Sequence, residues 1–125
     1  MRKIEVTLDK VREIKFSINA MGELEDRFNK SVPELFALGS PGIRVMVAMM
    51  RIGLKYGGMK IPGKSIEDQE LFIGDLVQEH WVNEGNSINE LMDSVKDSLQ
   101  EAGLIPKEEE VEDEDKQNPD MDTDE

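Results

Sequence analysis

The segment that decides the fold is residues 41–56, with the sequence PGIRVMVAMMRIGLKY. Its only charged side chains are Arg44, Arg51 and Lys55, and at about 100° per residue they fall in one narrow stripe of a helix. The remaining surface of that helix is apolar or small. Because a helix this apolar is typically surrounded by its own domain, the segment predicts a central helix on which the other elements pack.

Three methionines of this helix, Met46, Met49 and Met50, offer a second use for its apolar surface. The methionine side chain is flexible and polarizable, which suits adaptable contacts with a partner. A body of this size has few other helices with which to cover the central one. The sequence therefore leaves two hypotheses open: the methionines are core residues, or they bind a partner. Phe72 and Trp81 are the next candidates for partner binding.

Toward the N-terminus, apolar residues alternate with polar ones. The alternating positions are Ile4, Val6, Leu8, Ile14, Phe16 and Ile18. A period of two predicts strands with one buried face, and the short polar link between the two runs predicts a β-hairpin. An isolated hairpin is barely stable, so we expect helices to cover its apolar face.

Capping signals divide the rest of the chain into helices. We expect these helices to begin at Asn19, Ser31, Ser40-Pro41, Ser65 and Ser87. The last helix has the most regular apolar stripe, formed by Ile88, Leu91, Met92, Val95, Leu99 and Ala102. Gly103 is expected to end it in a left-handed conformation. The predicted fold class is α+β, mainly α, with the N-terminal hairpin packed on four or five helices.

The charge divides the chain into two parts. Residues 106–125 contain eleven acidic residues and two lysines, so the net charge of −13 divides into −9 for this tail and −4 for the body. The tail has almost nothing apolar to bury, which predicts disorder. We therefore expect a domain over residues 1–105 and a disordered acidic tail over residues 106–125.

Composition also restricts the partners. No segment has the ~20 consecutive apolar residues of a membrane helix, and the N-terminus does not resemble a signal peptide, so we expect a cytoplasmic protein with no membrane partner. Repulsion between the acidic chain and phosphates argues against nucleic acid as a partner.

The sequence offers no catalytic or metal-binding constellation. The absence of cysteine excludes disulfides, thiolate zinc sites and a cysteine nucleophile. Asp120, Asp122 and Asp124 have the spacing of a calcium loop, but Glu125 occupies the position that requires glycine. His80 is the only histidine and has no obvious co-ligands. We expect no enzyme activity and no catalytic, cofactor-binding or metal-binding residues.

Three segments carry a family resemblance: residues 15–28, residues 31–38, and the central helix with its end at Gly53-Leu54. Together they resemble the small tail assembly chaperones of long-tailed bacteriophages, prophages and gene transfer agents. The family's helix start, F-x-x-N-A-L-x-E-L-E-E, is matched by Phe16, Asn19, Ala20, Glu23, Leu24 and Glu25. Met21 replaces the leucine, and Arg51 to Leu54 replace an aromatic-containing W-A-G-L helix end. The resemblance covers about residues 3–100, and its motif is one of packing rather than catalysis.

The resemblance implies a chaperone that binds the long, apolar tape measure protein and keeps it soluble during tail morphogenesis. Such a protein works in the host cytoplasm and is absent from the mature virion. The tail tube protein and a second copy of the chain are further candidate partners. Two other functions stay open, an acidic decoy that inhibits a DNA-binding protein and a structural tail component. The family shares no active-site residues that could be assigned here.

Overall fold

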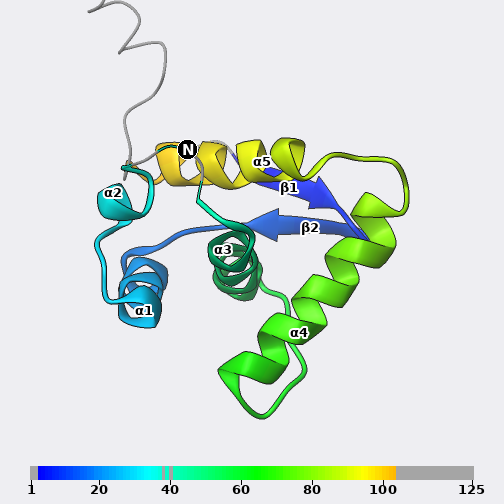
Figure 1. The fold of residues 1–125 in the computed structure, drawn as a ribbon, viewed down its shortest axis with the longest axis horizontal. Helices are drawn as coiled ribbons and strands as arrows, with labels where there is room; N and C mark the ends of the chain where they lie inside the picture. Colours follow the sequence, from blue (N-terminus) through cyan, green and yellow to red (C-terminus); the bar gives the residue numbers. More distant parts are fainter. Residues whose placement is uncertain (1–2, 38, 40, 104–125) are drawn as a thin grey trace, which may run out of the picture.

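The computed structural model describes residues 3–37, 39 and 41–103. A two-stranded antiparallel hairpin opens the chain and helices follow it (Figure 1). The elements are β1 (Ile4–Thr7), β2 (Val11–Ile14), α1 (Ile18–Phe28), α2 (Val32–Leu35), α3 (Ile43–Tyr56), α4 (Ile66–Val77), the π-helical turn η1 (Gln78–Val82) and α5 (Ile88–Glu101). The predicted α+β, mainly α class is confirmed.

The hairpin has the predicted buried face, except at its end. Its register pairs Ile4 with Ile14, and Val6, Leu8, Ile14 and Phe16 are all buried. Ile18 is 87% exposed, however, because it is the first residue of α1 and no longer part of a strand. The Oγ of Ser17 accepts a hydrogen bond from the Ala20 N–H, so Ser17 caps α1 in place of the predicted Asn19.

Three of the other predicted caps are confirmed, and one helix start is corrected. Ser31 and Glu34 form a reciprocal capping box at α2, and Ser65 and Ser87 cap α4 and α5 through their side chains. The helix predicted to start at Ser40-Pro41 starts instead at Ile43, with Gly42 as its N-cap.

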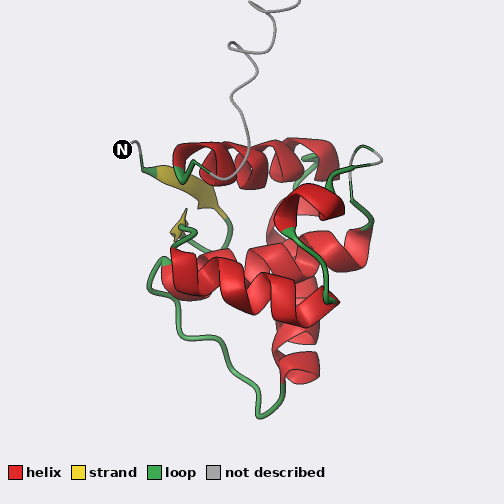
Figure 2. Ribbon diagram, turned by 90° about the vertical axis from the view of Figure 1, so that its left-hand side faces the viewer, coloured by secondary structure: helices red, strands yellow, loops and turns green. Residues whose placement is uncertain are grey.

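Helix α3 is the centre of the molecule, as its apolar sequence predicts. It packs against α1, α4, α5 and strand β2, and Figures 1 and 2 show these elements around it. Gly53 permits a close approach to the hairpin, since a Cβ there would lie 2.7 Å from the Ile14 Cγ2. The Lys15 N–H also donates to the Gly53 carbonyl oxygen at 3.0 Å. The hairpin is therefore attached to α3 by both packing and a backbone hydrogen bond.

Helix α5 covers the hairpin from the other side (Figure 1). Its stripe of Leu91, Met92, Val95 and Leu99 is buried as predicted. The Ser98 hydroxyl donates to the Ile14 carbonyl oxygen at 3.0 Å. Gly103 follows the helix with a positive φ of 81°, as expected for its end. The predicted domain boundary after residue 105 and the acidic tail lie outside the described residues.

A groove between α3 and α4 as the candidate functional site

The three methionines proposed for partner binding are core residues. Met46, Met49 and Met50 are each at most 1% exposed. The hairpin, α1, α4 and α5 together cover the faces of α3 on which these side chains lie. The hypothesis that these methionines form an exposed contact surface is therefore wrong for the folded chain, because the small body wraps its central helix more completely than expected.

Phe72 and Trp81 are half-buried and pack against the core. The Trp81 Nε1–H donates to the Ser87 carbonyl oxygen at 2.7 Å, which ties η1 to the start of α5. Trp81 lines a hollow of about 430 Å³ together with His80 and Leu8. Partner binding by Phe72 and Trp81 stays a prediction.

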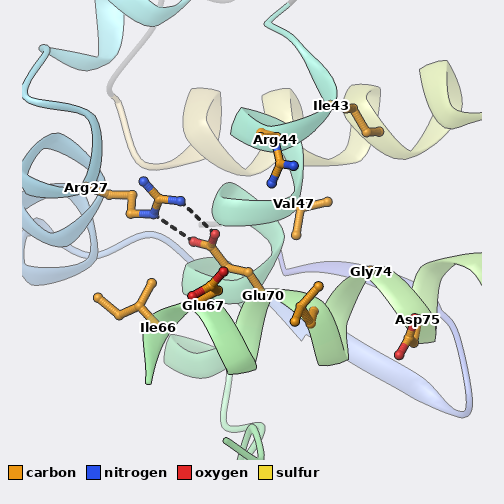
Figure 3. Close-up of a pocket in the computed structure, with 10 residues that line it drawn as sticks. Arg27, Ile43, Arg44, Val47, Ile66, Glu67, Glu70, Gly74 and Asp75 are labelled. Atoms are coloured by element: carbon orange, nitrogen blue, oxygen red, sulfur yellow. Dashed lines mark hydrogen bonds and ion pairs between the residues drawn. The ribbon is translucent and has the colours of Figure 1, made fainter. Parts of the chain in front are cut away.

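Exposed apolar side chains gather at a different place. Ile43, Ile66 and Leu71 are 57%, 51% and 63% exposed, and all three line one groove of about 770 Å³ between α3 and α4 (Figure 3). Val47 continues the apolar lining along α3. The other large apolar side chains exposed in the described ranges, Val11 and Ile18, are not part of the groove.

The sequence held one signal for this groove. Leu71, Phe72 and Ile73 are consecutive apolar residues of one helix, and at about 100° per residue they cannot all face the same core. Ile73 is buried, Phe72 half-buried and Leu71 exposed. Which of the three would face outward depends on where α3 lies, which the sequence alone does not give.

An ion-pair cluster joins the helices at the groove. Glu70 on α4 accepts two hydrogen bonds from Arg27 on α1, at 2.9 and 3.0 Å, as Figure 3 shows. Arg51 on α3 donates to the same carboxylate at 3.2 Å and is only 3% exposed. Burial of Glu70 raises the pKa of its carboxyl group, but the hydrogen bonds and charges of Arg27 and Arg51 outweigh that effect and leave its pKa below the ordinary value. Arg51 is therefore buried, although it shares one helical stripe with Arg44 and Lys55, which are exposed.

The rim of the groove carries unlike charges on its two walls. Arg44 is exposed on α3, and Glu67 and Asp75 are exposed on α4 (Figure 3). None of the three forms an ion pair within the described part of the chain. Gly74 also lines the α4 wall, and a Cβ at this position would meet no atom within 4 Å. The site is thus an open apolar groove with its rim charges free for a partner.

Elsewhere in the ranges that the structure describes, Glu23 on α1 accepts hydrogen bonds from the Nζ of Lys55, at 3.0 and 3.3 Å, and from the hydroxyl group of Tyr56 on α3. No group of three or more histidine, cysteine, aspartate or glutamate residues is close enough there to hold a metal ion. The Nε2 of His80 lies 3.7 Å from a carboxylate oxygen of Glu79. The aspartates with calcium-loop spacing are outside these ranges. Over the same residues, every helix is too short or too polar to cross a membrane.

Comparison with known proteins adds no relative: no family model, curated protein or solved structure matches this chain.

Proposed function

We propose that the protein is a tail assembly chaperone of a long-tailed bacteriophage, prophage or gene transfer agent. It binds the apolar, helical tape measure protein in the α3–α4 groove and keeps it soluble in the host cytoplasm until the tail is built. The observation that carries this proposal is the gathering of Ile43, Ile66 and Leu71 in one groove. Contiguous apolar surface of this kind typically marks an interaction site.

The shape of the groove supports a helical partner. Its two walls are the sides of α3 and α4, and the groove between two packed helices accepts an apolar helix face in a common mode of recognition. Each exposed isoleucine or leucine that becomes fully buried contributes about 1–2 kcal/mol to binding, before the costs of association. The charge of the chain supports a solubilising role, because eleven acidic residues over 106–125 would repel other complexes of the same kind.

The test is co-expression with the tape measure protein of the same phage, prophage or gene transfer agent, measuring how much of that protein remains in the soluble fraction. We expect the unaltered chain to keep it soluble, and Leu71→Gln and Ile43→Gln to lose this effect while remaining folded. Ile18→Gln is the matched control, because Ile18 is 87% exposed and lies outside the groove.

The outcomes separate the parts of the proposal. If the unaltered chain leaves the tape measure protein insoluble, the chaperone function is wrong. If all three variants hold it as well as the unaltered chain does, the groove is not the binding surface. Detection of the protein in purified particles would indicate a structural tail component instead.

A further inference from the structure

The dimensions of the groove match one short stretch of helix. Its α4 wall runs from Ile66 to Asp75, which spans about 14 Å at the rise of an α-helix. That length corresponds to two or three turns of a partner helix. Ile43 and Val47 on α3 are four residues apart and present one apolar row on the facing wall.

Gly74 leaves the α4 wall open at one point. It lies inside the helix, where glycine is about 1 kcal/mol less favourable than alanine. No neighbouring atom of the chain requires the glycine, because a Cβ at this position would have no atom within 4 Å. Any side chain at this position would project into open space that borders the groove. A helix lying in the groove can therefore approach α4 most closely at Gly74.

The rim charges differ between the walls. Arg44 carries a positive charge beside Ile43 on α3, while Glu67 and Asp75 carry negative charges on α4, two turns apart. Arg27 and Arg51 both pair with the single carboxylate of Glu70, so this cluster carries a net charge of +1 where Arg27 of α1 reaches the groove. A partner with the same charge on both flanks would meet repulsion along one wall.

From this geometry we propose, resting on the function above, that the groove takes one amphipathic α-helix of the partner with flanks of unlike charge. Its apolar stripe lies on Ile43, Val47 and Leu71. An acidic flank faces Arg44, and a basic flank faces Glu67 and Asp75. Because turning the helix end for end exchanges its flanks, the rim charges also fix the direction in which the helix binds.

The probe is a 14-residue helical peptide with blocked ends and leucines at spacings of three and four, made in three versions. One version carries glutamate on one flank and lysine on the other, the second carries glutamate on both flanks, and the third carries lysine on both. Binding to the full chain is measured by fluorescence anisotropy at physiological salt. We expect the mixed peptide to bind more tightly than the glutamate peptide. The difference in affinity should be roughly twofold to fivefold for each glutamate of the weaker peptide that faces a carboxylate of the rim.

Reversing a charge at the rim separates two effects: the preference of Arg44 for an acidic flank, and the general attraction of an acidic chain for any basic peptide. Arg44→Glu should raise the affinity for the lysine peptide relative to that for the mixed peptide. The control is Lys10→Glu, which changes the net charge equally but lies at the exposed hairpin turn. If the two variants show the same ratio of lysine-peptide affinity to mixed-peptide affinity, Arg44 does not determine the charge of the flank that faces it.

A large side chain in the groove tests whether the partner helix binds against α4 at Gly74. Gly74→Leu should weaken binding of the mixed peptide at least tenfold while raising the melting temperature, because leucine favours the helix. Gly22→Leu is the control, since Gly22 is also inside a helix with no atom within 4 Å of its Cβ position but lies outside the groove. If Gly74→Leu binds the mixed peptide as tightly as the unaltered chain does, the proposed binding position beside Gly74 is wrong. If no peptide binds although the tape measure protein is kept soluble, the single-helix occupant is wrong and the chaperone function stands.

Discussion

The Nε–H of Arg51 donates to an Oε atom of Glu70 across 3.2 Å, and this contact joins the middle of α3 to α4 at the groove. Arg51 is 3% exposed, so water cannot compensate its charge. Glu70 meets that need and also binds Arg27 from α1. One carboxylate therefore holds three helices at the spacing that shapes the groove.

Glu70→Gln should lower the free energy of unfolding by about 3 kcal/mol, because it leaves the buried Arg51 without its counter-charge. The measurement is urea denaturation at neutral pH. Glu67→Gln is the matched control one turn earlier on α4, where the side chain is exposed, and we expect it to change stability by less than about 0.5 kcal/mol. Similar small effects of both changes would show that the cluster does not hold α3 to α4.

Stability should fall on acidification below pH 4.5, the ordinary pKa of a glutamate. Burial raises the pKa of Glu70, but Arg27 and Arg51 bring it below that value in the folded chain. The unfolded chain therefore binds the proton first, so the stabilisation is complete above pH 4.5 and is lost as the pH falls through the folded pKa. Glu70→Gln should flatten this part of the curve of unfolding free energy against pH. An acid slope as steep in the variant as in the unaltered protein would assign the effect to other carboxylates.

Two helical glycines should respond in opposite directions to alanine. Gly53→Ala should cost about 1–3 kcal/mol, because the new Cβ would lie 2.7 Å from the Ile14 Cγ2 and force α3 away from the hairpin. Gly74→Ala should stabilise by up to about 1 kcal/mol, since its Cβ meets no atom within 4 Å. Thermal melting of the two variants in parallel checks the pair. A stable Gly53→Ala protein would contradict the close packing of α3 on β2.

Helix α5 should depend on its buried stripe more than on its cap. Leu99→Ala should cost about 2–5 kcal/mol, because Leu99 is fully buried. Ser87→Ala should cost about 1 kcal/mol through loss of the hydrogen bond from the Glu90 N–H to the Ser87 Oγ. Negligible effects of both substitutions on the unfolding free energy would mean that α5 is not docked on the hairpin.

Local signals in the sequence predicted most of the elements but not the contact surface. The alternation from Ile4 to Phe16 and the caps at Ser31, Ser65 and Ser87 act within a few residues, so they could be identified without knowing the fold. The cap of α1 was misplaced because Ser17 and Asn19 are both good capping residues and only the packing of Phe16 and Ala20 decides between them.

The groove depends on relations that no local pattern contains. Arg51 occupies a charged position in the helical stripe, yet it is buried because Glu70, nineteen residues further along, reaches it from α4. Ile43 resembles a core residue by sequence but lies at the end of α3 beyond the cover of the other helices. The apolar character of α3 was correctly identified, whereas which of its residues remain exposed follows from tertiary packing.

Photo-crosslinking in cells that produce both proteins tests most directly whether the groove binds the tape measure protein. A photoreactive phenylalanine analogue is placed at Leu71, in the groove, or at Ile18, which is more exposed than Leu71 but lies outside the groove. We predict a covalent adduct with the tape measure protein from position 71 and none from position 18. An adduct from position 18 alone, or equal adducts from both positions, would contradict binding in the α3–α4 groove.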